Sequence, residues 1–130
     1  MSDYTLVNFT DAEDMAAKHG LSPHIESRFL RSHMGSEHLG VSWFKLEPGF
    51  RPPFGHHHDV QEEAYVVVRG SGRFKLGDDI VDVGEGDVLR VAPHVMRGFE
   101  AGDDGIEIIA IGSDRPEDGD GHMEQNWWAD

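Results

Sequence analysis

The chain has 130 residues, which is enough for one domain of ordinary size. Its net charge of −14 comes from 25 acidic and 11 basic residues, which argues against nucleic acid or an anionic membrane as a partner. The sequence has no cysteine and no apolar run near the ~20 residues that a membrane-spanning helix needs. We therefore expect a soluble, cytoplasmic protein without a disulfide framework.

Residues 1–38 are expected to form a helical and extended segment ahead of the main domain. The run Thr10-Asp11-Ala12-Glu13 has the form of a capping box and predicts a short helix over 11–18. Gly20 would end this helix. The pair Ser22-Pro23 could open a second helical turn, because proline is favoured at the first helical position.

Residues 39–112 are expected to form the main domain, built from short strands joined by turns rich in glycine and aspartate. The strand at 63–69 is apolar on both faces, so it needs cover from a core on one side and from another element or subunit on the other. Short strands at this spacing favour a sandwich or a barrel. The predicted strands are 39–47, 63–69, 72–77, 80–83, 87–92, 97–101 and 106–111.

The remaining residues, 113–130, form a polar tail that carries Trp127 and Trp128. Two tryptophans after a polar run suggest an anchor that docks on a groove of the barrel or on a neighbouring subunit. The alternative is a mobile tail with incidental aromatic residues. We expect both rings to be at least half buried, because large aromatic side chains gain free energy by leaving water.

The most informative segment is the histidine run before the strand at 63–69. Residues two apart on a strand share a face, so His56 and His58 would point the same way, while His57 and Asp59 would point the opposite way. Glu63 would return to the first face after a turn. Two histidines and one carboxylate are donors that bind a divalent transition metal and leave positions open for substrate. The alternative is a polar surface loop with a fortuitous histidine run.

This segment resembles the first sequence motif of the cupin superfamily. The spacing from His56-x-His58 through four residues to Glu63, and through six more to Gly70, matches that motif. Gly49 stands six residues before His56, one more than the usual count. The resemblance implies a small single-domain bacterial cupin: an all-β, jelly-roll barrel (a double-stranded β-helix) that forms a homodimer. It also implies that the metal ligands are the two histidines and the glutamate.

A second cupin motif is weaker and lies at 86–97. Ala92 takes the place of the family's proline, His94 that of its glycine, and Arg97 that of its histidine ligand. The fourth ligand of the family is therefore missing or replaced by a cation. The resemblance covers about residues 39–112.

The departure at Arg97 leaves several interpretations open. An inward guanidinium would oppose a bound cation, and it could instead pair with Glu63 or hold the carboxylate or phosphate of an anionic ligand. It could also point to solvent. His94 could turn inward as a substitute metal ligand, and Tyr65 or His94 could contact the bound ligand or serve in acid–base steps. Sequence alone permits Glu62 in place of Glu63, although the count to Gly70 favours Glu63, and strand alternation then sends Glu62 outward.

We expect a cupin-type barrel that binds a divalent transition metal (zinc, nickel, manganese or iron), a small and possibly anionic ligand, or both. The alternative is a metal-dependent oxidoreductase of the dioxygenase type, or an isomerase, that uses a site of two histidines and one carboxylate. Nothing in the sequence identifies the substrate.

Overall fold

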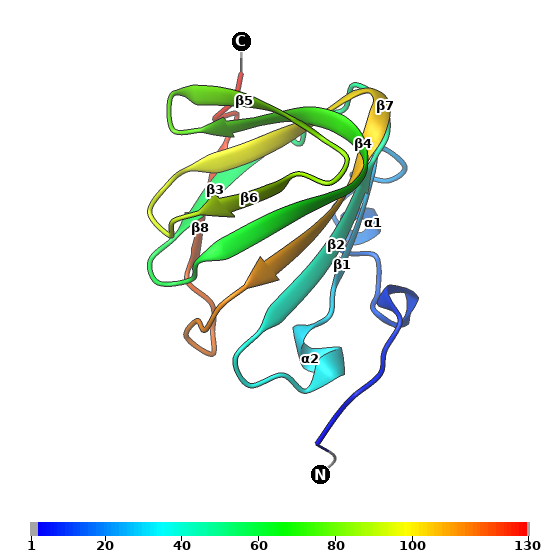
Figure 1. Cartoon of the computed structure of the whole chain (residues 1–130), viewed down its shortest axis with the longest axis vertical. Helices are drawn as coiled ribbons and strands as arrows, with labels where there is room; N and C mark the ends of the chain where they lie inside the picture. Colours follow the sequence, from blue (N-terminus) through cyan, green and yellow to red (C-terminus); the bar gives the residue numbers. More distant parts are fainter. Residues whose placement is uncertain (1–2, 130) are drawn as a thin grey trace.

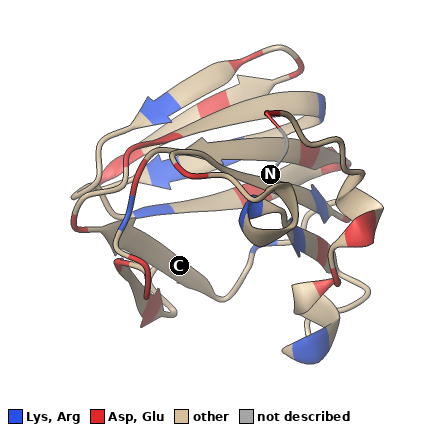
Figure 2. Cartoon of the chain, turned by 90° about the horizontal axis from the view of Figure 1, so that it is seen from below, with Lys and Arg blue, Asp and Glu red and all other residues tan. Residues whose placement is uncertain are grey.

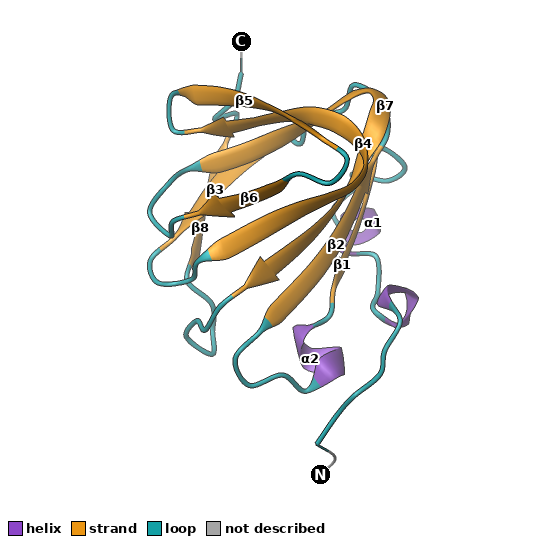
Figure 3. Ribbon diagram, in the orientation of Figure 1, coloured by secondary structure: helices purple, strands orange, loops and turns teal. Residues whose placement is uncertain are grey.

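The computed structural model describes residues 3–129, in which antiparallel strands curl into a barrel (Figure 1). The short helices lie along one side of the strands (Figure 3). The expected all-β architecture with a short helical N-terminal segment is confirmed. The elements in chain order are the 3-10 turn η1 (Phe9–Asp11), α1 (Met15–Lys18), β1 (Ile25–Phe29), α2 (Arg31–Met34), β2 (Gly40–Leu46), β3 (Phe54–His58), β4 (Glu63–Leu76), β5 (Asp79–Gly84), β6 (Val88–Val91), β7 (Arg97–Gly112) and β8 (Gly121–Gln125).

Two long strands, β4 and β7, connect the walls of the barrel. One path through the sheet runs β1-β2-β7-β3-β8, and β4 pairs with β5, β6 and β7. The predicted strands at 63–69 and 72–77 are continuous in β4, and those at 97–101 and 106–111 are continuous in β7. Both strands pass through irregular pairing rather than ending, which lets one strand serve both walls.

The irregular pairing depends on Gly70. Its φ of +79° lies in the left-handed region, and a Cβ built there would lie 2.1 Å from the carbonyl oxygen of Gly105. Only glycine allows β4 and β7 to approach so closely at this bend.

The core consists of apolar side chains at alternating positions of the strands. Phe74 and Ile108 are almost fully buried. Alternation places these side chains in the barrel interior and sends their neighbours outward. Other members of the cluster are Ala16, Ile25, Leu46, Tyr65, Val67, Val83, Val91, Ala101, Ile106 and Ala110.

The N-terminal segment differs from the helix predicted over 11–18. The 3-10 turn η1 is capped by Asn8, and α1 begins only after Asp14, whose Oδ1 accepts hydrogen bonds from the N–H groups of Ala16 and Ser27. The predicted capping box at Thr10 is therefore wrong. Asp14 caps the helix better because it also satisfies a backbone donor of β1.

Two strands were not predicted. In β1 the inward positions are Ile25, Ser27 and Phe29. Because Ser27 is polar, the sequence does not show the alternation of apolar and polar residues that indicates a strand. In β8 the side chains are all exposed, so the strand depends on backbone pairing with β3 rather than on apolar burial. No helix among the described residues is long and apolar enough to cross a membrane.

The segment after β8 docks on the barrel of its own chain. Trp128 is buried and Trp127 is partly buried, as predicted. The ring of Trp127 lies over Gly55 and Gly98, where a Cβ at Gly55 would come within 2.5 Å of it. The Arg51 guanidinium lies 4.2 Å from the Trp128 ring centroid, a cation–π contact.

Candidate metal centre

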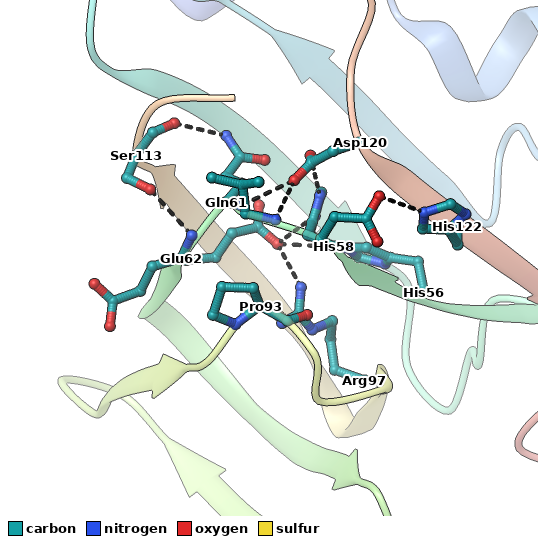
Figure 4. Close-up of polar contacts among 12 residues, drawn as sticks. His56, His58, Gln61, Glu62, Pro93, Arg97, Ser113, Asp120 and His122 are labelled. Carbon is teal, nitrogen blue, oxygen red and sulfur yellow. Dashed lines mark hydrogen bonds and ion pairs between the residues drawn. The ribbon is translucent and has the colours of Figure 1, made fainter. Parts of the chain in front are cut away.

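Three side chains converge inside the barrel, and Figure 4 labels two of them, His56 and His58. His56 and His58 share the inner face of β3, and Glu63 is the first residue of β4. Glu63 Oε1 lies 3.4 Å from His56 Nε2 and 3.2 Å from His58 Nε2. One possible ligand atom from each residue lies within 4.8 Å of the others, so this cluster could hold a metal ion.

The carboxylate of Glu63 is held by more than the two imidazoles. The hydroxyl of Tyr65 donates to Oε1 at 2.8 Å, and Arg97 Nη1 donates to the same oxygen at 3.0 Å. Burial alone would raise the pKa of Glu63, but hydrogen bonds from His56, His58 and Tyr65 outweigh it and hold the pKa well below its usual range. Glu63 is therefore a preformed anion.

Arg97 points into the barrel and is only 1% exposed. It is the first residue of β7, where its backbone is the register partner of His56. Nη2 donates to the carbonyl oxygen of Ala92 at 2.8 Å, and Nε has no partner among the described residues. Of the alternatives left open by the sequence, the ion pair with Glu63 is the one observed, and the solvent-facing alternative is wrong.

Tyr65 is buried beside the cluster and lines the same cavity. Burial raises the pKa of its hydroxyl well above the ordinary value, and the negative charge of Glu63 raises it further. The hydroxyl therefore remains protonated and acts as a hydrogen-bond donor at neutral pH.

Asp120 is the residue that the sequence interpretation missed. It lies just before β8, its side chain is 2% exposed, and its Oδ1 lies 2.8 Å from His58 Nδ1. Its Oδ2 accepts hydrogen bonds from the backbone N–H groups of Val60 and Gln61, which fixes the turn between β3 and β4 (Figure 4). No motif marks this residue, because only the pairing of β8 with β3 brings it to the site.

The contact with Asp120 determines how His58 can act. With Nδ1–H donated to Asp120, Nε2 is the nitrogen that faces Glu63, and a metal that displaces the Nε2 proton would be ligated there, in the arrangement of a metal-ligating histidine. Burial alone would lower the pKa of His58, but hydrogen bonds and charge from Glu63 and Asp120 outweigh it and raise the pKa.

Other candidates lie outside this cluster. His94 is exposed and does not line the cavity, so the structure does not bring it to the cluster. The turn that carries it directs the Ala92 carbonyl, rather than a histidine ring, toward Arg97. Glu62 points outward and accepts a hydrogen bond from Arg90 Nη1 at 2.7 Å. His57 lies beside His122, with ring centroids 5.0 Å apart, on the outer side of the β3–β8 pair.

The cluster opens onto a cavity of about 510 Å³ inside the barrel. This volume is within the range of small-molecule sites, about 300–1,000 Å³. Aromatic side chains from five strands and apolar groups from α1 line most of it. A ligand in this cavity would contact the polar cluster and an apolar wall at the same time.

The three donors fit a divalent transition metal. Two imidazoles and one carboxylate suit iron, manganese, nickel or zinc and leave coordination positions free. The Arg97 guanidinium beside the same carboxylate oxygen disfavours a cation there, so this donor set is weaker than one with a fourth neutral ligand.

Comparison with known proteins identifies the family. A family model described as the Cupin domain matches residues 42–112, so the chain belongs to the cupin family. No curated protein sequence matches the chain significantly.

Similar solved structures agree on the fold. A cupin protein from Bacteroides fragilis aligns with a TM-score of 0.71 at 23% identity, over 90% of this chain and 89% of that one. Oxalate decarboxylase from Bacillus subtilis aligns with a TM-score of 0.73 at 24% identity, over 93% of this chain but only 32% of that one. KdgF from Halomonas sp. aligns with a TM-score of 0.60 at 20% identity, over 90% of each chain. The chain spans about a third of oxalate decarboxylase, and these likenesses establish the cupin barrel rather than an activity.

Proposed function

We propose that this protein binds one divalent transition metal per chain through His56, His58 and Glu63, and a small anionic ligand beside it. The observation that supports this most directly is the convergence of the three donors within 4.8 Å inside a ligand-sized cavity. The contact of Asp120 with His58 Nδ1 supports it further, because metal-ligating histidines commonly donate their second nitrogen to a carboxylate.

The test is elemental analysis of protein purified without added metal, followed by calorimetric titration with Zn²⁺, Ni²⁺ and Mn²⁺. We expect about one equivalent of a transition metal, bound or bindable, per chain. Absence of metal from the purified protein, together with no heat of binding for any of the three ions, would refute the proposal.

Arg97 and Tyr65 are the residues that we propose contact the ligand. Both are buried, line the cavity and donate hydrogen bonds to Glu63 Oε1. When a metal takes up that oxygen, the released hydroxyl and guanidinium would donate to a carboxylate or another oxygen anion bound next to the metal.

A metal-dependent oxidoreductase or isomerase is the second candidate function. It is favoured by the donor count, because three protein ligands leave room for substrate or dioxygen at the metal. The role of this chain's own residues would be to hold the metal and to keep a protonated hydroxyl at Tyr65. Oxygen uptake or substrate isomerisation that appears with added metal and disappears with a chelator would support this function.

We also propose a homodimer through the outer face of the barrel wall formed by β6, β4 and β7. Val88, Val66 and Ile109 follow one another across these strands in register, and Val88 is 66% exposed. Ile111 on the same strand as Ile109 is 39% exposed. A second copy would cover this apolar row. Light scattering of the wild type and a Val88→Lys variant is the test, and a monomeric wild type would refute it.

A further inference from the structure

We infer that the ligand of this cavity is a monoanion with an aromatic body, such as an aryl-substituted carboxylate. This inference rests on the proposed function, since it assigns the ligand class of the same site. Two independent observations carry it: the charge of the groups that line the cavity, and the chemistry of the walls opposite the metal donors.

The charge of the cavity is opposite to that of the protein. The whole chain has a net charge of −14, and acidic residues are spread over the ribbon (Figure 2). Among the described residues that line the cavity, three are arginines (Arg31, Arg97 and Arg115) and two are acidic (Glu63 and Asp120), a balance of +1. Both acidic side chains are already occupied by hydrogen bonds from neighbouring groups. A bound divalent cation would make the lining more positive, so the cavity favours an anion over a neutral ligand or a cation.

The wall away from the polar cluster is aromatic. The Phe44 ring makes edge contacts with Phe29 and Phe99, at centroid distances of 5.8 and 5.6 Å. The ring of Phe74 lies 5.5 Å from that of Phe99, and all four rings line the cavity. An aromatic ring prefers such edge and tilted neighbours, which add to the free energy of its transfer from water.

The Glu63 end of the polar cluster and Phe44 lie at different levels of the barrel. Glu63 is in register with Gly112 on β7, and Gly112 with Gly40 on β2, so the polar cluster lies at this level of the barrel. Phe44 pairs with Ile108 four positions further along the same two strands. A ligand that spans both levels has a polar head and an apolar body rather than polar groups at each end.

The lining also determines which anions the cavity disfavours. A dicarboxylate with no carbon beyond its two carboxylate groups, such as oxalate, would leave the four phenylalanine rings without an apolar partner. A sugar acid would place hydroxyl groups against them, and few described polar side chains are available there to replace lost water. An aryl monocarboxylate avoids both costs.

The experiment is a calorimetric titration of zinc-loaded protein with four matched probes. 3-Phenylpropionate carries the ring and the charge, 3-phenylpropionamide keeps the ring without the charge, propionate keeps the charge without the ring, and oxalate has two charges and no apolar body. We expect 3-phenylpropionate to bind at least about tenfold more tightly than each of the other three. If the amide, propionate or oxalate binds as tightly as 3-phenylpropionate, or if 3-phenylpropionate does not bind, the inference is wrong.

Two variants locate the binding to this cavity. Ser42 lines the cavity beside the aromatic wall and makes no side-chain hydrogen bond among those found in the described residues, so Ser42→Leu fills space without removing a known contact. It should weaken 3-phenylpropionate at least about tenfold and leave the bound zinc unchanged. Arg115→Gln should weaken the probe severalfold, while Arg69→Gln, which removes the same charge from an exposed position outside the cavity, should not. Unchanged binding in both Ser42→Leu and Arg115→Gln would overturn the assignment.

Failure of this inference is distinguishable from failure of the proposed metal site, because zinc content is measured on each sample before titration. If the protein holds zinc but does not prefer 3-phenylpropionate, the proposed metal site stands and the proposed ligand class is wrong. If the protein holds no zinc but still prefers 3-phenylpropionate, the proposed metal site is wrong and the proposed ligand class stands. This outcome is possible because the positive charge and the aromatic rings belong to the chain itself.

Discussion

The two faces of the β3–β8 pair carry the same kinds of side chain in different surroundings. On the inner face, His56 and His58 meet Glu63, and Asp120 orients one of the rings. On the outer face, His57 lies beside His122, whose Nε2 contacts Asp59 at 2.9 Å. The inner donors converge within 4.8 Å, and the outer three do not form such a group among the described residues. In this barrel, histidines and carboxylates form a candidate metal site where β3, β4 and the residue before β8 bring them to one point.

Of the changes that distinguish the inner from the outer face of the β3–β8 pair, removal of the inner histidines should have the largest effect, which is loss of bound metal. The double variant His56→Ala/His58→Ala removes two of the three donors and should reduce bound metal from about one equivalent to near zero. The matched variant His57→Ala/His122→Ala removes two histidines from the outer face of the same strands and should keep the metal. Elemental analysis of the three proteins checks this, and equal metal content in both variants would contradict the comparison.

The next effect tests whether orientation of His58 matters as much as its presence. Asp120→Asn replaces the carboxylate beside Nδ1 with a group that is a weaker acceptor, so metal affinity should fall by about 10- to 100-fold. Asp118→Asn, at an exposed position two residues earlier, is the control. Zinc titration in a competing chelator measures both, and equal affinities would show that Asp120 only supports the fold.

The same residue gives a pH dependence in the metal-free protein. Burial alone would raise the pKa of Asp120, but hydrogen bonds from Gln61, Val60 and His58 lower it from 3.8 to about 2. A lowered pKa contributes stability that is fully present above the ordinary value and is lost as pH falls through the folded-state pKa. The difference in melting temperature between the wild type and Asp120→Asn should therefore shrink as pH falls from about 4 to about 2. A difference that stays constant over this range would contradict the assignment.

A smaller effect is expected from Arg97→His. Removing a permanent positive charge beside Glu63 and adding an imidazole should both tighten metal binding, by about tenfold. Calorimetric titration with Zn²⁺, Ni²⁺ and Mn²⁺ is the measurement. If the variant binds all three ions no more tightly than the wild type, Arg97 does not occupy the position of the family's fourth ligand.

Removing the segment after β8, which docks outside the cavity, should lower the stability of the protein and leave the metal in place. Truncation after Gln125 removes the tryptophan pair, including the buried Trp128, whose burial contributes about 2–3 kcal/mol. The melting temperature should fall by about 5–10 °C. Tyr4→Ala, at a position that is 84% exposed, is the control and should have no effect. An unchanged melting curve after truncation would show that the docked segment is passive.

The sequence predicted the parts of the fold and site that depend on local spacing. The strand alternation at 56–63 and the match to the first cupin motif were enough to choose the three candidate donors and the barrel. The second motif correctly identified Arg97 as a residue of the site. It did not decide whether the guanidinium pairs with Glu63 or binds an anionic ligand.

The parts that could not be predicted depend on contacts between distant segments. Ser27 interrupts the apolar pattern of β1, and β8 has no buried face, so neither strand has a local signal. Asp120 stands in a run of aspartate, glutamate and glycine, where nothing local distinguishes it from its exposed neighbours. Its role follows from tertiary pairing alone.

The pairing of β3 also has a consequence for synthesis of the chain on the ribosome. On one side β3 is in register with β7 only at His56 and Arg97, whereas on the other side all five of its residues pair with β8. All the other strands precede β8, so β3 has little to hold it until β8 has been translated. The histidines then remain mobile in a nascent chain, and the geometry of the candidate metal centre forms only after translation has passed residue 125.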